Sequence, residues 1–154
     1  MPPLNQDNAM DVFAFLQKQK GSFETFTIQL PTQNRGADKA NSSVKVVGAH
    51  SAADGTISLD GFTASTSGVL KAGDLIKFSG HSKVYMVQAD IDSDSGGAAT
   101  ILIEPNLVTT LADNEVVTMN QPSFTVYLPN EEILYATDPS GFYDISFDVR
   151  EVIS

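Results

Sequence analysis

The stretch DLIKFSGHSKVYMVQADI, residues 74–91, contains two runs of β-forming residues separated by a short polar turn. In the second run, Val84 and Met86 lie on one face of the expected strand, and Tyr85 and Val87 lie on the other. Because apolar side chains occupy both faces, the pattern predicts a strand that is buried on both sides.

Shorter runs of the same kind flank this stretch between Pro31 and Pro122. They are residues 44–47 (VKVV), 56–59 (TISL), 99–105 (ATILIEP) and 115–119 (EVVTM). Tight-turn sequences, including Asp54-Gly55 and the stretch 94–97, separate some of the runs. Six short strands with burial on both faces predict a small closed β-barrel.

The segments on either side of this region show a simpler alternation. Apolar and polar residues alternate at 26–30, at 124–128 and at 143–149. A period of two predicts three strands of an antiparallel sheet with one apolar and one polar face.

Only the start of the chain has the pattern of a helix. Asn5 or Asp7 can cap its N-terminus. The apolar residues at helical spacing are Ala9, Val12, Phe13 and Leu16, and Lys18, Lys20 and Gly21 follow at the expected C-terminus. Met10 and Phe15 fall outside that stripe, so either the helix is deeply buried in its own subunit or Phe15 faces a partner chain.

These patterns predict a mainly β fold of the α+β class. An antiparallel sheet covered by one N-terminal helix forms the base, from residues 1–31 and 122–154, and a small β-barrel is inserted within residues 32–121. The barrel is preceded by a polar arm at 32–43, which has no large apolar side chain. We therefore expect the arm to be mobile and sensitive to proteases.

The last strand of the predicted base sheet would have an exposed edge. The last strand, expected over 142–153, is long and carries four alternating apolar residues. Exposed edges of this sort recruit other chains. We therefore expect backbone pairing from a neighbouring chain to complete one edge of the sheet.

Composition excludes several classes of protein. The chain has 154 residues and a net charge of −10, from 19 acidic and 9 basic side chains. This balance argues against binding to nucleic acid or to an anionic membrane surface. No run approaches the roughly 20 apolar residues of a membrane span, and the absence of cysteine excludes disulfides and thiol catalysis.

The residues that could carry chemistry form no recognisable site. His50 and His81 lie in turn sequences without a nucleophile motif, so we expect surface or turn-packing roles. The aspartates at 90, 92 and 94 fail the EF-hand pattern, because Ser95 and Ile101 occupy the positions of its glycine and glutamate. These residues predict no catalytic, metal or cofactor site.

The order of segments is more informative than any single motif. It runs through PPL (2–4), GSFETFTIQLP (21–31), GTISLDGF (55–62), SGVLKAGD (67–74), GGAATILIEPNL (96–107) and FDVREVI (147–153). This series resembles a family of tail proteins of tailed bacteriophages and prophages, which are small virion components near the tail tip or baseplate. The resemblance extends from Pro2 to Ile153.

The resemblance implies a non-enzymatic structural subunit, repeated as a ring around the tail axis like a distal tail protein. Its expected partners are further copies of the chain and other tail proteins, with no cofactor, nucleic acid or membrane. Its expected place is the virion, after assembly in the host cytoplasm. Family members usually carry further strands ahead of the Pro-Pro-Leu segment, so here either the start is trimmed or another chain supplies those strands.

The expected contact surfaces are the helix and the polar face of the sheet. The candidate interface residues are Met10, Phe15, Tyr127, Asp144, Asp148 and Arg150. One alternative is a carbohydrate- or receptor-binding β-module, whose aromatic platform would come from Phe62, Tyr85, Tyr127, Tyr135 and Tyr143. A second alternative is a head or neck decoration protein.

Overall fold

The structure is a computed structural model that describes residues 4–31, 34–130 and 133–154. The chain divides into two compact units. The helix–hairpin unit comprises Met1–Thr27 and Thr125–Val152, and the barrel unit comprises Ile28–Phe124 and Ile153–Ser154. The fold is mainly β with one α-helix among the described residues, which confirms the predicted fold class.

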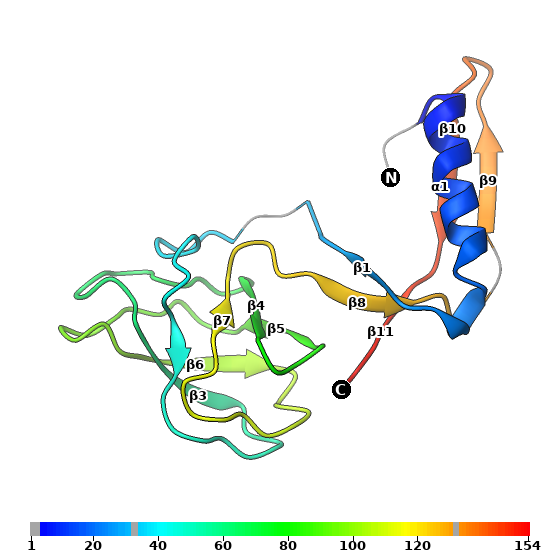
Figure 1. Cartoon of the computed structure of the whole chain (residues 1–154). Coiled ribbons are helices and arrows are strands. Elements are labelled where there is room, and N and C mark those ends of the chain that lie inside the picture. The colour runs from blue at the N-terminus through cyan, green and yellow to red at the C-terminus, as the bar shows by residue number, and fades with distance from the viewer. Residues whose placement is uncertain (1–3, 32–33, 131–132) are drawn as a thin grey trace. The chain divides into compact units, whose positions relative to one another are not determined.

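The barrel unit is a six-stranded antiparallel sheet that nearly closes on itself (Figure 1). Its strands are β2 (Lys45–Val46), β3 (Thr56–Asp60), β4 (Leu75–Phe78), β5 (Val84–Val87), β6 (Ala99–Glu104) and β7 (Val117–Thr118). Their order is β2-β3-β6-β5-β4-β7, and a bridge between Lys45 and Val116 joins the two end strands. Each of the six strands coincides with a run that the sequence predicts, and β3 extends one residue beyond its run, to Asp60.

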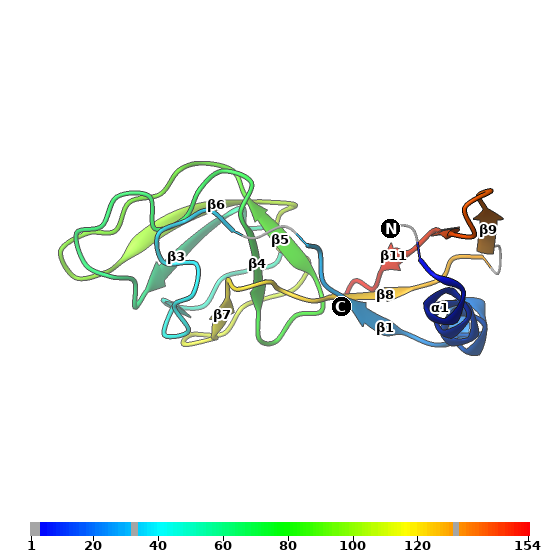
Figure 2. The ribbon, with the colours of Figure 1, turned by 90° about the horizontal axis from the view of Figure 1, so that it is seen from above.

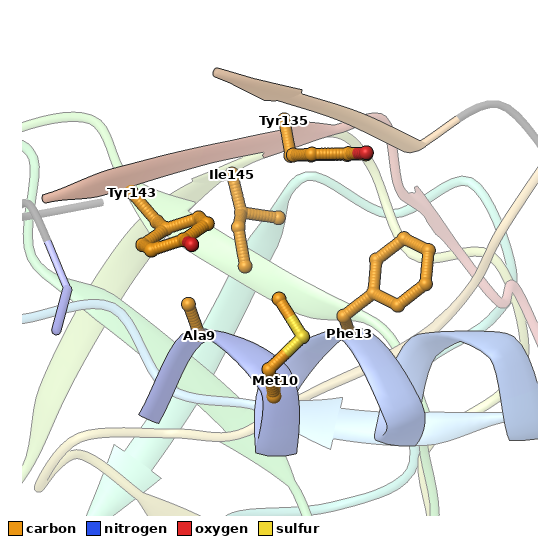
Figure 3. A pocket seen from close by; sticks show the side chains of 6 residues that line it. All are labelled: Ala9, Met10, Phe13, Tyr135, Tyr143 and Ile145. Carbon is orange, nitrogen blue, oxygen red and sulfur yellow. The ribbon is translucent and has the colours of Figure 1, made fainter. Parts of the chain in front are cut away.

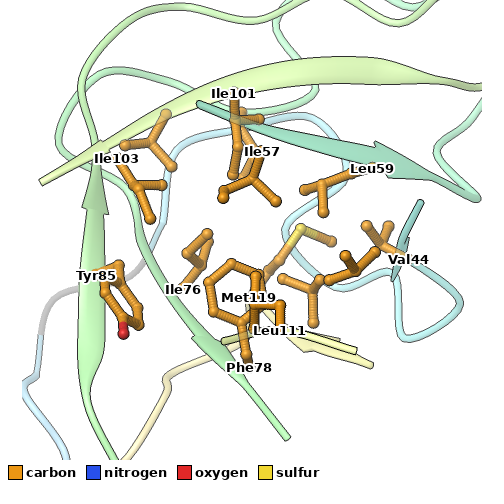
Figure 4. Packing of buried hydrophobic residues seen from close by; sticks show 14 of the residues in the cluster. Val44, Ile57, Leu59, Ile76, Phe78, Tyr85, Ile101, Ile103, Leu111 and Met119 are labelled. Atoms are coloured by element: carbon orange, nitrogen blue, oxygen red, sulfur yellow. The ribbon is translucent and has the colours of Figure 1, made fainter. Parts of the chain in front are cut away.

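Alternate side chains of these strands fill the barrel (Figure 4). Ile57, Phe78 and Tyr85 are fully buried there. One expectation about β5 is wrong: Met86 is 44% exposed, although Val84 on the same face is buried. Tyr85 and Val87 point inward, and the outer face of β5 is therefore only partly covered.

Residues 34–43 are packed against the barrel, which corrects the expectation of a mobile arm; residues 32–33 lie outside the described residues. The buried Asn34 side chain accepts a hydrogen bond from the Leu75 N–H (2.8 Å) and donates to the carbonyls of Leu75 (2.6 Å) and Met119 (2.7 Å). Its amide thereby takes the place of a backbone peptide beside β4. The polar composition of this segment suggested mobility, but its polar side chains anchor it to the barrel by hydrogen bonds.

A buried carboxylate anchors the same segment. Asp74 is almost completely buried and accepts hydrogen bonds from the backbone N–H groups of Arg35 (2.7 Å), Gly36 (2.9 Å) and Lys71 (3.0 Å). A Cβ added at Gly36 would lie 2.2 Å from the Val69 carbonyl oxygen, so only glycine fits at this close approach.

The helix–hairpin unit contains α1 (Gln6–Lys18), the short 3-10 helix η1 (Gly21–Phe23) and two small sheets. Asn5 caps α1, as predicted, by accepting a hydrogen bond from the Asn8 N–H at 2.9 Å. The sheets are the β9–β10 hairpin (Ile133–Thr137 and Tyr143–Phe147) and the set β1 (Phe26–Ile28), β8 (Phe124–Tyr127) and β11 (Arg150–Glu151). In Figure 2, β1, β8 and β11 run alongside one another in the order β1-β8-β11.

The prediction of a single C-terminal strand over 142–153 is wrong. It is divided into β10, which pairs with β9, and β11, which pairs with β8. The sequence DPSG after β9 makes the hairpin turn, where Asp138 accepts hydrogen bonds from the N–H groups of Ser140 and Phe142 at 2.9 Å. Because β9 occupies one edge of β10, the three-stranded sheet from which we expected strand addition does not exist in that form.

The core of the helix–hairpin unit is small. Among the described residues its core cluster consists of Ala9, Leu16, Leu128 and Ile145, and Val126 is buried outside this cluster. Other apolar side chains around this cluster are only partly buried. Within the described part of the chain, no helix has the length and apolarity that a membrane crossing needs.

Candidate functional site

An apolar groove opens between α1 and the β9–β10 hairpin (Figure 3). Its volume is about 260 Å³, and it is lined by Ala9, Met10, Phe13, Tyr135, Tyr143 and Ile145. The helical residues lie on neighbouring turns of α1, and Tyr135 and Ile145 are register partners in the hairpin. The two elements therefore hold apolar side chains on both walls of the groove.

Two of the lining side chains are exposed although they are large and apolar or aromatic. Met10 is 45% exposed and Tyr135 is 62% exposed. The Phe13 and Tyr135 rings meet edge to face, with centroids 5.9 Å apart and an interplanar angle of 69°. The lining offers no acid, base or nucleophile beyond the two tyrosine hydroxyls, so the groove is suited to receiving an apolar side chain rather than to chemistry.

Further apolar side chains of the same unit are exposed outside the groove. Phe23 is 87% exposed at the end of η1. Leu134 on β9 and Phe142 beside the hairpin turn are also exposed. Sequence reasoning overlooked Phe23 and Leu134; Phe23 could have been noted, because it follows Gly21 outside any periodic run.

The six predicted interface residues do not come together. Met10 lines the groove, whereas the exposed Phe15 packs its ring against Phe26 at 5.4 Å between centroids. Tyr127 and Arg150 are register partners on β8 and β11.

The other two predicted residues lie apart from the groove. Asp144 is exposed on β10, on the face opposite Ile145. Asp148 lies beyond the end of β10 and lines a separate shallow depression beside Leu134. These two positions, like the other four, remain candidates for contact with other chains.

The histidines have packing partners in the barrel unit. The His81 ring is buried, with Nδ1 2.9 Å from the Tyr85 hydroxyl and Nε2 3.1 Å from the Thr109 hydroxyl. His50 Nε2 accepts a hydrogen bond from the Ser58 N–H at 3.3 Å. Among the residues that the structure describes, neither ring has a hydroxyl and a carboxylate arranged around it as a nucleophilic triad requires.

The aspartates at 90, 92 and 94 cap turns. The N–H groups of Ala98 and Gly96 hydrogen-bond to Asp94 and lower the pKa of its carboxyl. The Gly68 N–H and the Ser67 hydroxyl do the same for the pKa of Asp92. No group of three His, Cys, Asp or Glu side chains that could hold a metal ion occurs among the described residues.

The aromatic residues considered for a carbohydrate platform are not displayed together. Phe62 and Tyr85 are buried in the barrel core, whereas Tyr127 and Tyr143 are half-buried in the other unit. Tyr135 alone among the five is exposed. A sugar-stacking platform from this set is therefore not formed within either unit.

A comparison with protein families supplies the remaining observation. Residues 32–121 match the family described as distal tail protein pb9, B domain. The chain belongs to this family. The matched residues make up more than half of the chain and contain all six strands of the barrel.

Membership in the distal tail family confirms the resemblance to phage tail proteins and supports a structural role in a phage tail. A search of curated proteins found no match. The family match covers the barrel, whereas the groove and Phe23 lie in the helix–hairpin unit.

Proposed function

We propose that this chain is a non-enzymatic structural subunit of a bacteriophage tail, present in several copies as a ring near the tail tip or baseplate. The observation that carries the proposal is the match of residues 32–121 to the distal tail family. In this proposal the base, residues 1–31 and 122–154, makes contacts between subunits, and residues 32–121 form an inserted module.

The exposed surface of the helix–hairpin unit supports this assignment of contacts. Its exposed large apolar side chains are Met10, Phe15, Phe23, Leu134, Tyr135 and Phe142. A unit whose buried core cluster has only four side chains gains little stability from its own packing. Contacts with neighbouring tail subunits would bury the exposed side chains and complete that core.

The net charge of −10 is compatible with a position around a DNA-conducting tube. Negative charge along such a tube repels the phosphate backbone and keeps the passing duplex from binding to the wall. The absence of cysteine also suits a protein that assembles in the reducing host cytoplasm.

Immunogold labelling of intact particles, combined with quantitative mass spectrometry, tests the proposal. We expect label at the distal end of the tail and several copies of the chain per particle. Label on the head or neck would contradict the proposal and favour a decoration protein. A single copy per particle would contradict the ring.

A further inference from the structure

Phe23 is unusually exposed for a large apolar side chain that lies in a defined turn. Its side chain is 87% exposed, and its backbone closes the turn by donating a hydrogen bond from its N–H to the Lys20 carbonyl at 3.5 Å. Lys20 and Gly21 both have positive φ, at 53° and 63°, which ends α1 and directs the chain into η1. The ring is therefore presented on a short structured protrusion.

The groove described above has room for such a ring. An engineered apolar cavity of about 150 Å³ is known to hold a benzene molecule, and the groove measures about 260 Å³. The edge-to-face pair of Phe13 and Tyr135 offers a third ring the T-shaped contacts that aromatic side chains prefer.

Phe23 does not fill the groove of its own chain, since it is absent from the lining and its side chain is exposed. Met10, at the groove, and Lys18, at the end of α1, are already about 12 Å apart along a rigid helix at 1.5 Å per residue. Phe23 follows beyond that end of α1. One unit thus carries an apolar groove along α1 and an apolar protrusion after its C-terminus.

We propose that Phe23 of one copy inserts into the groove of a second copy, in a head-to-tail contact. This inference rests on the proposed function, in which many copies are neighbours in one assembly. A contact of this kind is heterologous, so repeating it produces a ring if the rotation closes and a filament if it does not.

The charges around the two surfaces favour this partner and this polarity. The N-terminal half of α1 carries the exposed Asp7 and Asp11. The C-terminal end of α1 and the turn around Phe23 carry the exposed Lys18, Lys20 and Glu24, which leaves this end with a net charge of +1. Head-to-tail contact brings the lysines of one copy toward the aspartates of the next. Head-to-head contact would instead bring like charges together in a chain with a net charge of −10.

Photo-cross-linking of the full chain tests the contact even when association is transient. Phe23→benzoylphenylalanine keeps an aromatic protrusion and places a photoreactive ketone on it. We expect dimers and higher oligomers whose cross-linked peptides include Met10, Phe13 or Tyr135. Phe142→benzoylphenylalanine, at another exposed phenylalanine of the same unit, is the matched control and should give no such products.

Two further measurements test the assignment. The Phe23→Ala chain should self-associate about 10- to 100-fold more weakly than the wild-type chain in sedimentation equilibrium, the loss expected for an unburied phenylalanine. In the cross-linking experiment, the double variant Lys18→Glu and Lys20→Glu should lower the yield of intermolecular products, and so should added salt.

Several outcomes would overturn the inference. These are an absence of intermolecular products at position 23, products that map outside the groove, or equal yields at positions 23 and 142. Each would leave the family assignment intact, because that rests on the match of residues 32–121. Failure to find the chain in tails would instead refute the proposed function.

Discussion

The barrel unit and the helix–hairpin unit differ sharply in how completely they bury their apolar residues. Among the described residues, the barrel core contains seventeen buried apolar side chains, whereas the core of the helix–hairpin unit contains four. The barrel also has buried polar anchors, such as Asn34 and Asp74. The helix–hairpin unit instead has an open groove and an exposed phenylalanine.

This difference indicates two kinds of stability within one chain. A nearly closed barrel satisfies its strand edges and its apolar faces internally. The helix–hairpin unit has a core cluster of only four buried side chains and therefore gains little stability from its own packing. We therefore expect the barrel to be self-sufficient and the helix–hairpin unit to depend on neighbours.

The largest effect is expected in the barrel core. Phe78→Ala removes a fully buried ring and should lower the free energy of unfolding of the barrel by about 3–5 kcal/mol. Met86→Ala on the adjacent strand is the control, because its side chain is 44% exposed, and it should cost less than about 1 kcal/mol. Urea denaturation measures both; equal losses would contradict a closed, tightly packed core.

The next effect concerns the polar anchors. Asp74→Ala leaves the buried N–H group of Gly36 and the partly buried N–H groups of Arg35 and Lys71 without their acceptor, and it should lower the free energy of unfolding by about 3 kcal/mol. We expect trypsin to cleave after Arg35 and Lys39 faster in this variant than in the wild-type chain. Asp113→Ala, which removes an exposed hydrogen bond to the Gly48 N–H, is the control and should leave the rate of this cleavage unchanged.

A smaller and local effect is expected in the other unit. Leu16→Ala should lower the free energy of unfolding of this unit by about 2 kcal/mol, at the low end for buried leucines, because water can enter from the surface depression that Leu16 lines with Leu128. The loss should appear in the helical circular dichroism signal at lower urea than the unfolding of the barrel. A single transition shared by both units would show that their stabilities are not separate.

The smallest effect is the acid dependence of the barrel. Burial acts to raise the pKa of Asp38, but hydrogen bonds from the Thr63 N–H and hydroxyl and from Asn41 outweigh it and lower the pKa. A carboxyl whose pKa is lowered by folding stabilises the protein at pH values above its pKa in the unfolded chain, about 3.9. This stabilisation is lost as the pH falls through the pKa in the folded chain. The urea concentration at the midpoint of barrel unfolding should therefore be constant between about pH 5 and 7 and should decrease as the pH drops below about 4. Asp38→Asn should weaken that dependence, as titrated urea unfolding can show.

The barrel was predictable from sequence because its strands combine β-forming residues with turn signals such as Asp54-Gly55. The hairpin was not predicted, because the run 143–149 alternates so regularly that it suggested one long strand. The DPSG turn was the available signal for β9 and β10.

The anchoring of residues 34–43 and the groove depend on tertiary contacts that composition does not reveal. Asn34 and Asp74 are 40 positions apart, and only folding brings both to β4. Met10 was singled out because it departs from the helical stripe, and it does line the groove. Its partner Tyr135 lies on a strand that the sequence did not predict, so the groove itself could not be predicted.

Hydrogen exchange of the full-length chain, dilute and free and then in assembled tails, tests most directly whether the two units differ in self-sufficiency. We expect slow exchange in β3, β4, β5 and β6 in both states. In α1, β9 and β10 we expect fast exchange in the free chain and strong protection after assembly. Equal protection of α1 and the barrel in the free chain, unchanged by assembly, would contradict the account.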